Sequence, residues 1–209
     1  AGSHAGHAIA HHDPRKGRPV NMVRHTIDVC AVLRSAVNQT YGNLLTRPTG
    51  MAVRHQIERE LAAVREGGIT SLDFSSIGMM DYSCADEVVA KLLVLLENED
   101  PTRGGFVVFR GIGEDHLELV ESVLTNHGLA LVCVCEDGSP QLIGAVSTAE
   151  RRAWEMVRSH GCAAPAELAD AFGFGEDFVA EVLDALSRRR LVRRGSGGYL
   201  ALVAADTVQ

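Results

Sequence analysis

The chain has 209 residues, of which 46% are hydrophobic and 22% are charged, and its formal net charge is −7. This balance is typical of globular proteins, and the length suits one large domain or two small ones. No apolar run approaches the roughly 18 residues that a membrane-spanning helix needs, and no basic region followed by a continuous apolar stretch stands at the start. We therefore expect a cytoplasmic protein that has no membrane-spanning segment.

Residues 1–22 differ from the rest of the chain. They hold His4, His7, His11 and His12 among glycines, prolines and basic residues, without hydrophobic periodicity. Histidine-rich tracts of this kind are typical of tags or disordered extensions. We expect a tail that takes no part in the fold.

The cysteines do not form a recognisable pattern. All five are scattered and their number is odd, which argues against a disulfide framework. Cys133 and Cys135 share one face of an expected strand, but no second pair with zinc-ligand spacing follows. The sequence also lacks the order Ser-His-Asp and a glycine-rich phosphate loop. We predict no metal site, no cofactor and no enzymatic activity.

The first part of the folded chain predicts strands and one helix. Alternating apolar residues predict a strand over 23–34 that forms a hairpin, through residues 35–39, with a second strand over 40–47. Apolar residues at helical spacing predict a helix over 52–64. A short apolar run over 69–74 predicts a central strand.

The segment Met79–Glu87 is the most informative in the sequence. An acidic, hydroxyl-bearing loop here opens an amphipathic helix. Ser83 is a candidate helix N-cap, and Asp86 three residues later completes a capping box. Asp81, Tyr82 and Ser83 would then lie beside free backbone amides, which favour negative charge. We therefore expect a phosphate on this loop to be stabilised locally, so that the loop can act as a switch.

The following elements complete an α/β pattern. The helix that begins in the loop continues to the acidic run near residue 97, and further segments predict strands over 106–110, 129–135 and 141–146, with a helix over 114–127. Helices between successive strands are typical of parallel crossovers. We predict an α/β fold with an open mixed sheet and helices packed on it.

The strand, the Asp-x-Ser loop and the following helix resemble the corresponding segment of STAS domains, the superfamily of sulphate transporters and anti-sigma factor antagonists. In particular, Ser83-Cys84-Ala85-Asp86-Glu87 is similar to the Ser-x-Ala-Asp-Glu pattern of STAS-like regulators often encoded beside histidine-kinase-type ATPases. The resemblance covers residues 23–146. It implies a STAS-like fold and an ATPase of that type as the protein partner.

In anti-sigma factor antagonists the resemblance implies a phosphorylated serine directly after the Asp of an Asp-Ser-Ser-Gly loop. Here Tyr82 occupies that position, Ser83 occupies the next, and Cys84 replaces the glycine. Ser83 is thus the phosphorylation candidate by residue type and Tyr82 by position. Asp81 and Asp86 would form an acidic rim that a partner contacts.

Residues 147–205 predict a second, small α+β domain. Helical patterns over 149–159, 164–172 and 176–190 precede two strands around a glycine-rich tip within 191–203. This order resembles a winged helix-turn-helix domain.

Charge decides whether such a domain suits DNA. The third helix has four acids and no base from residue 176 to residue 187. The positive cluster that follows, and that would contact DNA phosphates, is Arg188, Arg189, Arg190, Arg193 and Arg194. No region is basic on the scale that dominates nucleic-acid affinity, and these arginines can equally interact with the end of their own helix.

Two functions remain open from the sequence. In the first, a STAS-like domain docks a protein partner through Asp81, Tyr82, Ser83, Asp86 and Glu87, and the winged helix is an interaction or output arm. In the second, the chain is a DNA-binding transcription factor whose STAS-like part senses a signal or forms dimers. The sequence leaves homo-oligomer formation open in both.

Overall fold

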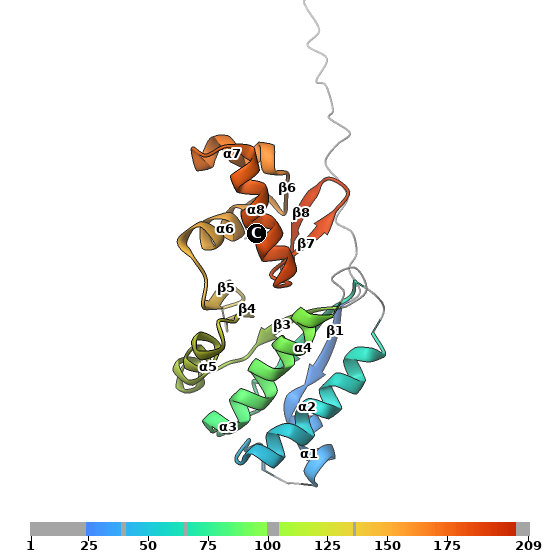
Figure 1. The fold of residues 1–209 in the computed structure, drawn as a ribbon. Coiled ribbons are helices and arrows are strands. Elements are labelled where there is room, and N and C mark those ends of the chain that lie inside the picture. Colours follow the sequence, from blue (N-terminus) through green and yellow to red (C-terminus); the bar gives the residue numbers. More distant parts are fainter. Residues whose placement is uncertain (1–23, 39–40, 65–66, 100–104, 136, 204–209) are drawn as a thin grey trace, which may run out of the picture.

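The computed structural model describes residues 24–38, 41–64, 67–99, 105–135 and 137–203. Within these residues the chain forms a mixed α/β structure with a five-stranded sheet and a three-stranded sheet (Figure 1). The predicted tail, residues 1–22, lies outside the described residues.

The five-stranded sheet follows the order of the sequence. Its strands are β1 (Arg24–Asp28), β2 (Ile69–Asp73), β3 (Phe106–Arg110), β4 (Ala130–Val134) and β5 (Pro140–Gly144). The first four are parallel, and β5 pairs antiparallel with β4. This confirms the predicted mixed sheet.

Because each crossover between parallel strands is right-handed and steps in one direction, its helices collect on one face of the sheet. These helices are α1 (Val29–Val37), α2 (Arg47–Ala62), α3 (Tyr82–Ala85), the π-helix η1 (Asp86–Lys91), α4 (Leu92–Asn98) and α5 (Glu114–His127). Their apolar side chains form a first core with strand residues such as Leu72, Phe109 and Leu131. The elements α3, η1 and α4 follow one another without a break.

The predicted hairpin of strands 23–34 and 40–47 is wrong. The strand β1 ends at Asp28, whose carboxylate accepts hydrogen bonds from the backbone N–H groups of Cys30 at 2.9 Å and Ala31 at 3.1 Å. Asp28 thereby caps α1, an N-cap that the alternating pattern concealed. Within the described part of 40–47, only Leu44 forms a strand-like bridge, and its partner is Met80.

The opposite face of the sheet carries a second core. Parallel strands buried on both faces are apolar on both, and Phe106, Val108, Ala130 and Val132 alternate with the residues of the first core. These side chains share one buried cluster with apolar residues from beyond residue 150. The C-terminal part of the chain therefore packs on the sheet through a common core.

That C-terminal part contains α6 (Thr148–His160), β6 (Cys162–Ala163), α7 (Pro165–Phe172), α8 (Glu176–Arg188), β7 (Val192–Gly195) and β8 (Gly198–Ala201). The strand β8 lies between β6 and β7, antiparallel to both. A capping box between Ser147 and Glu150 starts α6. The three predicted helices and the two late strands are confirmed, whereas β6 is an addition.

Candidate functional site

The loop before α3 is held by a segment that lies far away in the sequence. The N–H of Leu44 donates to the carbonyl of Met79 at 2.7 Å, and the N–H of Asp81 donates to the carbonyl of Leu44 at 3.0 Å. The side-chain oxygen of Asn43 also accepts from the N–H of Met79 at 3.2 Å. The two segments 41–47 and 79–83 thus form one surface, a pairing that local sequence patterns do not reveal.

Asp81, and not Ser83, is the N-cap of α3. Its Oδ1 accepts from the N–H of Cys84 and from the Ser83 hydroxyl, both at 2.8 Å, and its Oδ2 accepts from the N–H of Thr46 at 3.0 Å. Burial raises the pKa of Asp81, but these hydrogen bonds outweigh it and hold the pKa below its ordinary value. The predicted capping box of Ser83 and Asp86 is therefore wrong, because Ser83 already lies inside the first helical turn.

Thr46 has an unusual backbone conformation at the start of α2. Its φ of 84° is rare for a β-branched residue and costs on the order of 1–3 kcal/mol. Asp81 accepts from its N–H, and the Cys84 thiol donates to its carbonyl at 2.9 Å. The loop and the start of α2 therefore hold each other in one fixed arrangement.

Asp86 and Glu87 are buried, with side chains only 10% and 2% exposed. Asp86 lies 2.6 Å from Arg47 and 2.8 Å from His127, while Glu87 lies 2.9 Å from Arg47. Glu87 also pairs with Lys91 and, at 3.3 Å, with Arg54. The prediction that Asp86 forms an exposed acidic rim is wrong, because neighbouring helices cover it.

The burial of two adjacent acids has a structural cause. Five consecutive residues of η1 are buried because α2 and α5 pack along the same helix. Gly50 allows the close approach of α2, since a Cβ at this position would lie 3.0 Å from Cys84 Cα and 3.1 Å from Glu87 Cβ. π-Helical turns of this kind occur frequently at functional sites.

The two acids remain charged. Burial raises the pKa of each, but hydrogen bonds from Arg47 and His127 to Asp86, and from Lys91 and Arg47 to Glu87, hold both values below the ordinary range. Cys84, in contrast, has its pKa raised to about 12 by burial and by the nearby charge of Asp81. It therefore stays a thiol at neutral pH and is a poor nucleophile.

Large apolar side chains are exposed around this site. They belong to the two paired segments, to the second turn of α2 and to the first turn of α3. We call them the apolar patch: Tyr41 (78% exposed), Leu45, Met51, Met79 and Tyr82. The sequence pointed to Met79 and Tyr82 but not to the other three. The signal that could have found them is their position around Pro48, which marks the first turn of α2.

Of the five candidate DNA-contacting arginines, Arg190 is buried. Its guanidinium donates to the carbonyls of Leu96 at 2.6 Å, Gly105 at 3.0 Å and Glu99 at 3.2 Å. It does so from a left-handed backbone with φ 56°, just beyond the end of α8, where glycine is the usual residue. The prediction that Arg190 contacts phosphates is therefore wrong.

Arg189 also points into the protein. It donates to the carbonyls of Ala145 at 2.8 Å and Gly128 at 3.1 Å and pairs with Glu150 at 3.1 Å. Arginines are favoured at helix C-termini because the dipole is negative there, and Gly128 is the C-cap of α5. Arg189 and Arg190 together join the end of α8 to the sheet and its helices, so the prediction for Arg189 is wrong as well.

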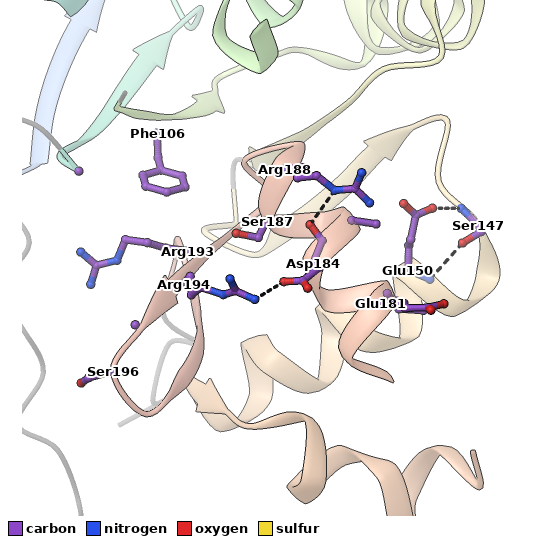
Figure 2. Close-up of a pocket in the computed structure, with 14 residues that line it drawn as sticks. Phe106, Ser147, Glu150, Glu181, Asp184, Ser187, Arg188, Arg193, Arg194 and Ser196 are labelled. Atoms are coloured by element: carbon purple, nitrogen blue, oxygen red, sulfur yellow. Dashed lines mark hydrogen bonds and ion pairs between the residues drawn. The ribbon is translucent and has the colours of Figure 1, made fainter. Parts of the chain in front are cut away.

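The other three arginines line a groove of about 1320 Å³ (Figure 2). Arg194 pairs with Asp184 and donates to the Tyr199 hydroxyl at 2.9 Å. The walls come from α8 and the β7–β8 turn on one side and from Phe106 and Gly67 on the other. The groove is lined by acids as well as by these arginines, since Glu150, Glu181 and Asp184 also contribute to its walls.

A smaller hollow of about 410 Å³ lies at the carboxyl ends of β2, β3 and β4, where Arg110, Gly111 and His116 contribute to its lining. Dinucleotides bind open α/β sheets where the strand order reverses. The strands β1 to β4 follow sequence order without such a reversal. This hollow is therefore not a site of that type.

Comparison with known proteins gives no family: no family model, no curated protein and no solved structure matches the chain. Among the described residues, none of the helices combines the length and the apolar character that crossing a bilayer requires. The same residues contain no group of three or more His, Cys, Asp or Glu side chains placed to hold a metal ion.

Proposed function

We propose that the chain is a non-enzymatic regulator of signal transduction or transcription that docks a protein partner through the surface formed by residues 41–47 and 79–87. The apolar patch carries this proposal. Exposed apolar clusters on a rigid scaffold are typical of protein interfaces, and Tyr, Met and Arg are enriched in them. The hydrogen bonds of Asp81 fix the backbone of this surface, so binding requires little ordering.

The proposed identity of the N-terminal part is a STAS-like domain, and a histidine-kinase-type ATPase is the proposed partner. The motif from Ser83 to Glu87 and the α/β fold support this identity. A regulator of this kind would act in the cytoplasm. The helical connection α1–α2 in place of a hairpin is where the chain departs from the expected topology.

Phosphorylation of the loop remains part of the proposal. A phosphate on Ser83 would carry about −1.5 to −2 charges and would replace a hydroxyl that now donates to Asp81. Two anions at that distance repel, so the modification would release the cap of α3. The local stabilisation of a phosphate that the sequence suggested is therefore wrong for Ser83, because the carboxylate of Asp81 already accepts from the N–H of Cys84. Tyr82 is the more exposed alternative, and its hydroxyl accepts a hydrogen bond from Asn126 at 2.8 Å.

For the C-terminal part we propose a winged helix that acts as an interaction arm. The order helix, strand, helix, helix, strand, strand supports the winged-helix identity. The internal contacts of Arg189 and Arg190 and the acids of α8 favour packing against the sheet over contact with DNA.

Binding to a purified histidine-kinase-type ATPase, the proposed partner, tests the docking surface. Met79→Asp should reduce capture of this ATPase by at least about tenfold, because loss of a central apolar contact in an interface costs about 2 kcal/mol or more. The matched control is Leu95→Asp, since Leu95 is similarly exposed (40% against 53%) but lies on α4. Equal capture by both variants contradicts the proposal. Sedimentation equilibrium of the chain alone shows whether a second copy occupies the patch instead.

DNA binding is the second candidate, because Arg188, Arg193 and Arg194 line the groove beside α8. We expect a random duplex to show no binding in fluorescence anisotropy at about 50 mM salt, where phosphate contacts are strongest. Binding with a steep salt dependence that is lost in Arg193→Ala would favour the transcription-factor function.

A further inference from the structure

We infer that the docking surface accepts an acidic segment with apolar anchors from its protein partner, so that the surface itself supplies the positive charge. This inference rests on the proposed docking function and specifies the chemistry of the partner. The acidic motif suggested that this chain presents negative charge to its partner, whereas we infer that it presents positive charge.

The geometry around Asp86 carries the inference. Two cationic side chains and one histidine surround its carboxylate: Arg47 at 2.6 Å, His127 at 2.8 Å and Lys91 at 3.8 Å. Their side chains are 50%, 37% and 43% exposed, whereas that of Asp86 is 10% exposed. We call Arg47, Lys91 and His127 the basic rim. The anions of this cluster lie inside and the cations lie at the solvent.

The basic rim keeps donors for a partner. Arg47 contacts both Asp86 and Glu87 through Nη1. Among the described residues, its Nη2 and Nε form no hydrogen bond or ion pair with a side chain. A guanidinium can bind a second carboxylate through these groups in a paired geometry. The buried acids fix the orientation of Arg47, so the entropy cost of that second contact is reduced.

The apolar patch lies directly beside the basic rim. Tyr82 precedes Asp86 by one helical turn, and its hydroxyl bonds Asn126, the neighbour of His127. Met51 follows Arg47 by one turn on α2. Cations and apolar side chains therefore share one surface. This mixture fits a protein segment with carboxylates beside apolar side chains better than the uniform phosphates of a nucleic acid.

Two labelled synthetic peptides test the inference by fluorescence anisotropy. The first is an amphipathic helix of leucine and glutamate, and the second has lysine in place of glutamate. We expect only the acidic peptide to bind, and its affinity should fall at least about tenfold between about 50 and 500 mM salt because exposed charges are screened. Equal binding of the two peptides, or no binding of either, overturns the inference.

Variants locate the binding. Lys91→Met keeps the aliphatic stem, and Tyr82→Ala removes an anchor. Each should weaken the acidic peptide about tenfold, while Arg34→Ala, an exposed arginine on α1, should not. Circular dichroism confirms that each variant is folded. If Met79→Asp abolishes capture of the ATPase but the acidic peptide never binds, the docking function stands and this inference fails. If the acidic peptide binds but Met79→Asp leaves capture of the ATPase unchanged, the ATPase docking proposal fails instead.

Discussion

The motif before α4 and the arginine run after α8 use charge differently. In the motif, Asp86 and Glu87 point inward, and their partners are cationic side chains whose outer parts remain at the solvent. In the arginine run, Arg189 and Arg190 also point inward, but their partners include main-chain carbonyls at the ends of other elements. The first arrangement leaves a charged surface for a visitor, whereas the second uses its charges to hold the protein together.

The largest expected effect comes from Glu87→Gln. This change removes the anion that Arg47, Arg54 and Lys91 share and leaves Arg54 largely buried without it. Breaking a buried ion pair costs about 3–5 kcal/mol, measurable as the free energy of unfolding in urea. Glu58→Gln is the control, since Glu58 pairs with Arg54 but is more exposed, so we expect a loss below about 1 kcal/mol. Equal losses would show that the inner anion has no special role.

Arg190→Ala should destabilise the protein by about 2–4 kcal/mol, because carbonyls left without donors cost about 1–3 kcal/mol each and are only partly rehydrated. Arg188→Ala is the matched control, because Arg188 is exposed two positions earlier and should change stability by no more than about 0.5 kcal/mol. Urea unfolding measures both. If the two substitutions cost the same, the distinction between the inner and outer arginines fails.

Gly50→Ala tests how closely α2 packs against the motif. The added Cβ would crowd Cys84 and Glu87 and push α2 away from η1, so we expect a loss of about 1–3 kcal/mol despite the better helix propensity of alanine. At Gly113 no heavy atom lies within 4 Å of the corresponding Cβ, so Gly113→Ala adds no clash and should cost less than about 1 kcal/mol, through the poorer N-cap preference of alanine. A higher melting temperature for Gly50→Ala than for the parent protein would contradict the tight packing of α2 against η1.

The two regions should also differ in pH dependence. The pKa of Asp86 is lowered, so its contribution is present above the ordinary carboxyl pKa of about 4 and is lost as the pH falls through the lower folded value. Asp86→Asn should therefore be less stable than the parent at pH 7, and the difference should shrink in acid. Urea unfolding at a series of pH values measures this.

Glu97, beside Arg189, should affect the pH dependence of stability in the opposite direction to Asp86, and by the smallest amount. Burial raises its pKa, against the charges of Arg189 and Arg190, so its stabilising contribution is present below the ordinary value and is lost as the pH rises through the folded one. Glu97→Gln should be more stable than the parent at neutral pH and equal to it in acid. A loss of stability at neutral pH would show that Glu97 acts as a salt-bridge partner instead.

Much of the fold was predictable because it is periodic. The strands β2 to β5 and the helices α5 to α8 follow apolar patterns that local sequence carries. The helix α1 was missed because Ile27, Val29, Ala31 and Leu33 imitate a strand while Asp28 caps a helix.

The sequence predicted where the candidate site lies in the chain, but not which contacts its residues make. Asp81 was identified, but its bond to Thr46 spans 35 positions, and the burial of Asp86 and Glu87 depends on α2 and α5. Contacts of that range leave no trace in a local pattern. The same is true of Arg190, whose partner Leu96 is 94 positions away.

The π-helical stretch Asp86–Lys91 has an evolutionary consequence. Such a stretch is an α-helix that has gained one residue, and each residue turns the helix by about 100°. Deleting a single codon within it would restore the regular repeat, rotating Asp86 away from Arg47 and His127 and Tyr82 away from Asn126, while α4 kept its place in the core. A one-residue deletion would thus dismantle the surface and leave α4 in the core.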